Sequence, residues 1–184
     1  MAWMLKPWGW ALGTVALVGG MPATLAQTPP LVAAETVEPT AVVLETTSYT
    51  YEDLFSIDFP VGWQVSEQAD APQVTAASAG GDSLPPIRTE VSWRDAPPRE
   101  VVSESLAAIQ AEGYTVARYD AVTIDGVTAV RLWINEIPAE LPNAFITYVG
   151  YPAATATITS YYGDTTAAID PVLKAIHESF QRSQ

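Results

Sequence analysis

The 184-residue chain carries 21 acidic and 8 basic side chains, which gives a formal net charge of −13 at pH 7. This balance argues against nucleic-acid binding, where lysine and arginine displace counterions from phosphates, and against adsorption to anionic lipid. The absence of cysteine excludes disulfides, thiol catalysis and thiolate metal sites. We therefore expect partners that are neutral, basic or cationic, and no nucleic acid.

The beginning of the chain has the pattern of a signal peptide, predicted over residues 1–26. Lys6 is the only early charge. The apolar run from Trp8 to Gly20 fits a signal-peptide core of ~7–15 residues and is shorter than a membrane span of ~20 residues. Small residues up to Ala26 indicate cleavage there, so no membrane span is expected afterwards. A retained anchor is the alternative, but the glycines and the proline that follow the run would break its helix.

The next segment, residues 27–47, is predicted to be a flexible tether, because it contains prolines, small residues and scattered glutamates without a sustained period. The folded domain is expected from 48 to 184. Its first two strands are predicted at 48–52 and 55–59. Alanine, glycine, serine and proline dominate residues 76–86, which predicts a loop.

The middle of the chain predicts a strand, a helix and a hairpin. Apolar and polar residues alternate over 87–94, which is typical of a strand with one buried face. Apolar residues at helical spacing follow the prolines at 97–98, and Gly113 is a natural C-terminal stop for that helix. Asp125-Gly126 is the strongest hairpin signal in the chain.

The last part of the chain predicts two strands, 145–151 and 155–162, and a closing helix whose apolar side ends at Phe180. Asp170 is the expected N-cap of this helix, and a short turn from Thr165 that feeds into it is the alternative. Consecutive strands without crossovers predict an antiparallel sheet. The sequence therefore predicts an α+β fold, an antiparallel β-sheet of about six strands flanked by two main helices.

One segment carries a family resemblance. Residues 55–63, Phe-Ser-Ile-Asp-Phe-Pro-Val-Gly-Trp, resemble the entry motif of PsbP-like domains, which include the extrinsic subunit of photosystem II and bacterial domains of unknown function. The mid-chain helix, the hairpin with Arg131-Leu-Trp, the strand that ends Ser160-Tyr-Tyr-Gly and the closing helix follow in the family's order. The resemblance covers residues 48–184 and implies a PsbP-like sandwich of sheet and helices.

The same resemblance implies an accessory or assembly role in an exported compartment, with a photosynthetic membrane complex as one expected partner. The chain departs from the family in two respects. The photosystem subunit docks through basic residues, whereas this chain is acidic. Cyanobacterial relatives are typically lipoproteins, whereas this chain has no cysteine to carry a lipid.

Catalytic chemistry has little support in the sequence. His177 is the only histidine, and acid–base or nucleophilic catalysis usually needs histidine, cysteine or an activated lysine. We interpret His177 as a boundary residue near a helix C-terminus, where partial positive charge is favourable. The carboxylates of Asp120, Asp125, Glu136 and Glu140 are interpreted as solvated surface groups rather than a calcium site. We expect no enzymatic activity, no cofactor and no metal.

The candidate binding residues are mostly aromatic. Trp133 lies beside Arg131 and opposite the apolar face of its strand, so either a helix covers both residues or they form an exposed recognition surface. Tyrosines of the last strands could frame a pocket, since tyrosine combines apolar area with a polar tip, although it is also an ordinary strand residue. The candidate binding surface consists of Arg131, Trp133, Tyr148, Tyr151, Tyr161 and Tyr162.

Three functions from different classes follow. The first is an exported, non-enzymatic accessory or assembly protein, a monomer in a periplasm or thylakoid lumen that binds a membrane protein complex through a neutral or basic surface. The alternative is a soluble periplasmic module that binds a small ligand or an envelope protein, which a deep tyrosine-lined pocket would favour. The third is an enzyme that uses carboxylates alone, which needs two of them facing each other across a cleft.

Overall fold

The computed structural model describes residues 44–78, 80, 84–163 and 168–183. The predicted signal peptide and the predicted tether up to residue 43 lie outside these residues. The first strand, β1, spans Thr46–Tyr51, so it begins two residues before the predicted start of the folded domain at residue 48.

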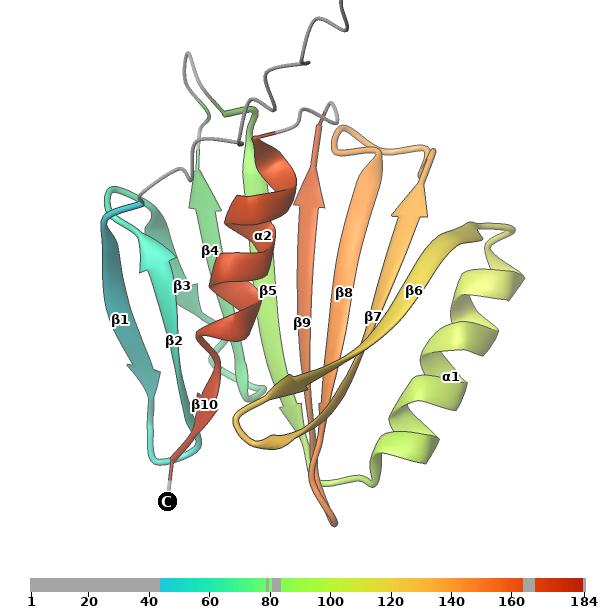
Figure 1. The fold of residues 1–184 in the computed structure, drawn as a ribbon, viewed down its shortest axis with the longest axis horizontal. Helices are drawn as coiled ribbons and strands as arrows, with labels where there is room; N and C mark the ends of the chain where they lie inside the picture. The colour runs from blue at the N-terminus through green and yellow to red at the C-terminus, as the bar shows by residue number, and fades with distance from the viewer. Residues whose placement is uncertain (1–43, 79, 81–83, 164–167, 184) are drawn as a thin grey trace, which may run out of the picture. The chain divides into compact units, whose positions relative to one another are not determined.

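Seven strands form one antiparallel sheet in the order β3-β4-β5-β9-β8-β7-β6 (Figure 1). A smaller antiparallel sheet has the order β1-β2-β10, with β2 in the middle. The large sheet contains β3 Gln64–Glu67, β4 Gln73–Ser78, β5 Ile87–Arg94, β6 Thr115–Ile124, β7 Val127–Asn135, β8 Asn143–Gly150 and β9 Thr155–Tyr162. The small sheet adds β2 Phe55–Pro60 and β10 Gln181–Arg182 to β1.

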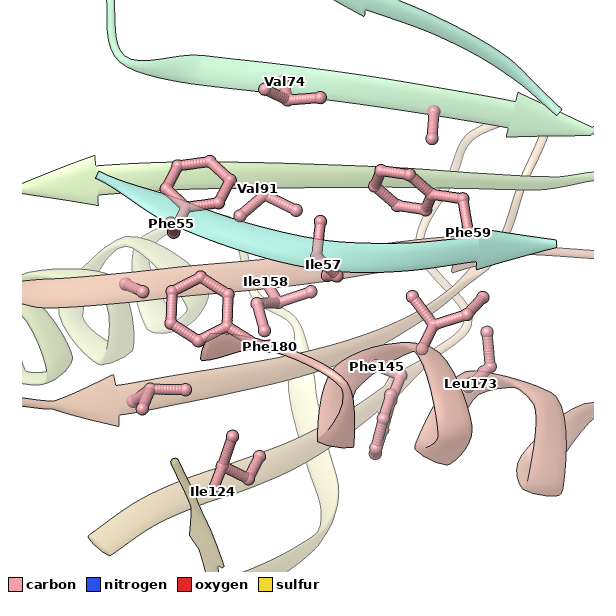
Figure 2. Close-up of a cluster of buried hydrophobic side chains, with 14 of the residues drawn as sticks. Phe55, Ile57, Phe59, Val74, Val91, Ile124, Phe145, Ile158, Leu173 and Phe180 are labelled. Carbon is pink, nitrogen blue, oxygen red and sulfur yellow. The ribbon is translucent and has the colours of Figure 1, made fainter. Parts of the chain in front are cut away.

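One face of the large sheet is covered by α2, Ile169–Glu178, and by the small sheet. The core between them contains Phe55, Ile57 and Phe59 of β2, which alternate with partly exposed residues along that strand. Figure 2 shows these side chains gathered with Leu173 and Phe180 against the large sheet. Burial of this continuous apolar surface is the main source of stability for a domain of this size.

The opposite face of the large sheet is partly covered by α1, Pro98–Ala111. Val101 and Ile109 of α1 pack with Leu132 and Ile134 of β7, and the same cluster includes Ala144, Ile146 and Tyr148 of β8. Because successive side chains of a strand point to opposite faces, β8 supplies apolar residues to both cores and is buried along nearly its whole length.

The predicted α+β fold with an antiparallel sheet and two main helices is confirmed. The hairpin at residues 125–126 joins β6 to β7 as predicted. Asp125 and Gly126 both have positive φ, 50° and 70°, as the tightest two-residue hairpin turns require. Gly113, with φ of 76°, follows the end of α1.

The prediction is wrong at a loop boundary and at a helix cap. Residues 76–78 belong to β4 rather than to a loop, and β4 pairs with β5 over its whole length. Asp170 is the second residue of α2 and not its cap, which is Ala168. The carboxylate of Asp170 instead forms an ion pair with Lys174 and accepts a hydrogen bond from the indole of Trp133. The alternative start at residue 165 lies outside the described residues.

The end of the described chain is hydrogen-bonded to the small sheet. β10 pairs with β2, and the backbone N–H of Ser183 donates to the carbonyl of Leu54 at 3.0 Å. The Arg182 guanidinium lies over the rings of Trp93 and Tyr151, with its carbon 5.5 Å and 5.2 Å from the ring centres. These contacts join the last strand to both sheets.

Candidate functional site

A cleft of about 350 Å³ opens between α1 and the outer face of the large sheet. Its volume is within the range of small-molecule sites, about 300–1,000 Å³. Three tyrosines and several aliphatic side chains line it, and Glu112 is the only charged residue among them. The lining consists of Ser105, Ala108, Ile109, Glu112, Tyr114, Ile134, Ile137, Ala144, Ile146, Tyr148, Thr157, Thr159 and Tyr161.

The cleft forms because α1 packs over β7 and β8 and leaves β9 uncovered. On β9, Thr157, Thr159 and Tyr161 point to the cleft side and are only partly buried. The alternate residues Ala156 and Ile158 belong to the core on the opposite face. The edge of α1 therefore forms one wall, and the row of threonines forms the floor.

Two further hollows share lining residues with the cleft. One, of about 310 Å³, shares Ile137 and Tyr161 and extends toward Arg88 and Glu140. The other, of about 340 Å³, shares Ser105 and Tyr148 and extends along the helix. Each of these two hollows therefore adjoins the tyrosine-lined cleft, which lies between them.

The tyrosines of the cleft present neutral hydroxyl groups. Burial raises the pKa of Tyr148 and of Tyr161 above the usual value, so both phenols stay protonated at pH 7. The Tyr148 hydroxyl is hydrogen-bonded to the Ser105 hydroxyl on α1. The Arg88 guanidinium lies 4.7 Å from the centre of the Tyr161 ring. The cleft therefore offers apolar surface with a few hydrogen-bonding groups, the usual composition of a ligand site.

The six candidate binding residues do not form one surface. Tyr148 and Tyr161 line the cleft on the α1 side. Arg131 and Trp133 lie on the α2 side and are 3% and 7% exposed. Tyr151 and Tyr162 are buried in the same core as Trp133. Alternation along β9 explains the split between its two tyrosines, because neighbouring residues of a strand point to opposite faces.

Arg131 and Trp133 are held by contacts with α2. The Arg131 guanidinium donates to the carboxylate of Glu178 at 2.8 Å, while its Nε has no hydrogen-bond partner among the described residues. The indole N–H of Trp133 donates to Asp170 at 3.3 Å. Burial opposes the ionised form of Asp170, but hydrogen bonds from Lys174 and Trp133 prevail and lower its pKa below the ordinary value. Both residues thus fasten α2 to the sheet.

Tyr151 is likewise engaged inside the domain. Its hydroxyl donates to the carboxylate of Asp125 at 2.6 Å, and its ring packs against Trp93 at 5.5 Å. Burial, with the hydrogen bond to Asp125, raises the pKa of Tyr151 far above its usual value. This contact ties the β6–β7 hairpin to the end of β8.

His177 is completely buried, which corrects its interpretation as a boundary residue. Its Nδ1 lies 2.7 Å from the hydroxyl of Thr147, and its Nε2 lies 2.9 Å from the hydroxyl of Ser160. Ser160 in turn is 2.7 Å from the hydroxyl of Thr89. Burial, and then the nearby charge of Arg131, lowers the pKa of His177 well below its ordinary value. The imidazole is therefore neutral, with one nitrogen donating and the other accepting.

The Ser160–His177 pair has the spacing of a nucleophile and its base, but no substrate can reach it. Ser160, His177, Thr147 and Thr89 are all 0% exposed. The group on the second imidazole nitrogen is a hydroxyl rather than the carboxylate that orients a catalytic histidine. The network gives hydrogen-bond partners to the buried polar side chains between α2 and three strands, β5, β8 and β9.

No three histidine or acidic side chains among the described residues lie close enough together to hold a metal ion. Of the carboxylates considered in the sequence, Asp120 is paired with Arg118, and Asp125 accepts hydrogen bonds from Tyr151 and from the backbone of Arg182. Within the described part of the chain, no helix is long and apolar enough to cross a membrane.

Among the residues of the cleft, sequence reasoning found only Tyr148 and Tyr161. It missed Ser105 and Ala108 of α1, Glu112 at the C-cap of that helix, and the threonines of β9. A signal for the threonines was present, because Thr155, Thr157 and Thr159 alternate with Ala156 and Ile158, which is typical of a strand whose outer face is partly hydrated. The helix residues carried no such signal, since a polar helix face is usually a solvated one.

The chain is similar to known proteins at the level of structure. No family model and no curated protein sequence matches the chain. The structure is similar to that of cyanobacterial PsbP (CyanoP) from Synechocystis sp. PCC 6803, with a TM-score of 0.55 and 13% sequence identity, over 84% of this chain and 99% of that chain. The described domain has a PsbP-like fold.

The structure is also similar to that of LpqN of Mycobacterium tuberculosis, a protein described as involved in cell envelope biogenesis. That match has a TM-score of 0.50 and 14% identity, and covers 77% of this chain and 92% of LpqN. The resemblance found in residues 55–63 is confirmed at the level of the fold. At these identities the similarity concerns the PsbP-like fold alone.

Proposed function

We propose that the chain is an exported, non-enzymatic accessory or assembly protein that acts by binding another macromolecule. The proposal depends mainly on one observation. Within a PsbP-like fold, the side chains best suited to catalysis make hydrogen bonds and ion pairs inside the domain. His177, the only histidine, and its partner Ser160 are completely buried and hydrogen-bonded to each other, and Arg131 forms an ion pair with Glu178. Export is supported by the predicted signal peptide at residues 1–26, and a periplasm or thylakoid lumen suits it.

The charge of the surface indicates what kind of partner fits. Five basic side chains of the described residues form ion pairs with neighbouring acids, whereas acids outnumber bases in the whole chain by 21 to 8. The free surface charge is therefore mostly negative. A partner with a basic docking surface would gain favourable long-range attraction, which salt weakens. A membrane protein complex, photosynthetic or of the cell envelope, is the proposed partner class.

Affinity isolation of the tagged protein from gently solubilised source membranes tests this function. We expect subunits of one membrane complex to accompany the protein, to be identified by mass spectrometry, and to be lost on washing at about 1 M salt, where the Debye length is about 3 Å. Untagged membranes treated in parallel identify background proteins. Recovery of the protein alone at low salt would contradict the proposal.

A second candidate function, the binding of a small apolar ligand, is favoured by the tyrosine-lined cleft. Its volume of about 350 Å³ suits one small molecule. Glu112 is its only charged lining residue, so a neutral or cationic ligand fits better than an anionic one. The neutral dye N-phenyl-1-naphthylamine is a suitable probe, because its fluorescence rises on transfer from water to an apolar site.

Filling the cleft is expected to abolish dye binding. Ala108 is exposed on α1 and lines the cleft, so Ala108→Trp places an indole in the opening. Ala107 is also exposed on α1 but does not line the cleft, which makes Ala107→Trp the matched control. We expect the first variant to weaken dye binding at least about tenfold, about 1.4 kcal/mol, and the second to leave it unchanged. Equal dye binding by both variants would place the dye elsewhere and remove this candidate.

A further inference from the structure

The strand β6 lies at the edge of the large sheet and carries an exposed aromatic side chain. β6 is the last strand of the seven-stranded sheet (yellow in Figure 1), paired on one side with β7. Its central residue, Tyr119, is 76% exposed, more than any other large hydrophobic side chain of the described residues. The free edge of such a strand presents unpaired backbone N–H and C=O groups that can pair with another strand.

The sequence of β6 is nearly palindromic about Tyr119. Residues 115–123 read Thr-Val-Ala-Arg-Tyr-Asp-Ala-Val-Thr, so every position matches its mirror position except Arg118 and Asp120. Those two differ by having opposite charge. If two copies of β6 pair antiparallel with Tyr119 opposite Tyr119, Arg118 of each copy lies opposite Asp120 of the other. The strand is thus complementary to itself in charge as well as in side-chain size.

The fold places these residues on suitable faces. Arg118 and Asp120 are aligned with Trp133 and Arg131 of β7 and share the α2 side of the sheet, where they form an ion pair with each other. Their side chains remain 54% and 35% exposed. Tyr119 is aligned with Leu132 and lies on the α1 side, yet its exposure shows that α1 does not cover it.

We propose that β6 pairs with β6 of a second copy of this chain, which forms a two-fold symmetric dimer with one continuous sheet. The partner is a second copy because an isologous interface brings the same patch of both subunits together, and only a self-complementary patch gains from that. In the dimer the two Tyr119 rings cover each other on one face. On the other face, two Arg118–Asp120 pairs cross the interface in place of the two pairs within the chains.

Two features of the molecule weaken the proposed dimer: an irregularity in β6 shortens the pairing, and the net charge of the chains adds repulsion. A bulge at Ala117 interrupts the ladder between Val116 and Arg118, so regular pairing across the interface covers the central residues 118–120. The net charge of −13 on each chain adds repulsion, although at about 0.15 M salt the Debye length of about 8 Å screens charges far from the contact. We therefore expect a reversible, concentration-dependent dimer. This inference does not depend on the proposed function.

Charge exchange at the centre of the strand provides the test. Arg118→Asp places aspartate opposite aspartate in a homodimer, and Asp120→Arg places arginine opposite arginine. Each variant alone is expected to dimerise at least about tenfold more weakly than the wild type. An equimolar mixture of the two variants restores both opposite-charge pairs, so the mixture is expected to form heterodimers. Sedimentation analysis of the full chain at rising concentration, in about 0.15 M salt, measures all four samples.

Further variants distinguish the loss of dimerisation from misfolding of the chain. The double variant Arg118→Asp/Asp120→Arg is self-complementary again and is expected to dimerise alone. Tyr119→Lys, at an exposed position, places two like charges on the two-fold axis and is expected to dissociate the dimer, while circular dichroism stays native. A wild type that remains monomeric at every concentration, or dimers that both single variants leave intact, would overturn the inference. Binding of a different protein to β6 in place of a second copy would overturn it as well.

Discussion

Replacing Phe145 with alanine is expected to lower the free energy of unfolding by about 3–5 kcal/mol. Phe145 is completely buried in β8, at the centre of the contact between α2 and the sheet. Its ring centre lies 4.8 Å from that of Trp133 and 4.5 Å from that of His177. Alanine would remove the ring and leave a cavity beside two groups that depend on it. Urea unfolding followed by tryptophan fluorescence measures the loss.

Phe145→Leu is the matched control for this prediction. It keeps most of the buried apolar volume, so we expect a loss of less than half that of the alanine variant. A second comparison is Tyr119→Ala, which truncates an exposed aromatic and is expected to change stability by less than about 0.5 kcal/mol. If Phe145→Ala were as mild as Tyr119→Ala, the description of a single core beneath α2 would be wrong.

Acidification is expected to destabilise the domain through His177. In the unfolded chain its pKa is the ordinary 6.5, whereas burial, and then the charge of Arg131, lowers the pKa of His177 in the folded protein. As the pH falls below 6.5, the unfolded state therefore binds up to one more proton than the folded state. The free energy of unfolding should fall by up to about 1.4 kcal/mol for each pH unit below that value, until the folded pKa is reached. Above pH 6.5 this contribution is constant.

The His177→Gln variant isolates this effect. Glutamine is uncharged at every pH and can still hydrogen-bond to Thr147 or Ser160, at a cost of about 1–3 kcal/mol for imperfect partners. We expect its stability to depend less steeply on pH than that of the wild type between about pH 6.5 and pH 5. Urea unfolding at several pH values measures both slopes. Identical slopes would mean that other groups cause the acid sensitivity.

Local signals in the sequence account for much of the fold. Alternation over β5 and the Asp125-Gly126 turn each depend on neighbouring residues, so both were predictable without knowledge of the tertiary structure. β3 was missed because all four of its residues are exposed, and therefore no apolar alternation marks it. β4 was missed because small residues fill its buried positions, such as Ala76, within a segment whose composition is typical of a loop.

The sites were less predictable because their residues meet only in three dimensions. His177 follows Ile176 on an apolar helix face, but its hydrogen-bond partners Thr147 and Ser160 are 30 and 17 positions away on separate strands. Likewise, the cleft exists because α1 lies over β7 and β8 rather than β9, a placement that no short motif encodes. The division of the candidate tyrosines between two faces follows from the same cause.

The pairing of β10 with β2 has a consequence for the order in which the domain is completed. β2 cannot obtain its second neighbour, and Trp93 and Tyr151 cannot meet Arg182, until residues 181–182 are available. β5 must likewise wait for β9, whose residues lie more than 60 positions later in the chain. Contacts between distant segments slow folding. The small sheet and the joint between β5 and β9 are therefore completed only when the last segments of the domain are available.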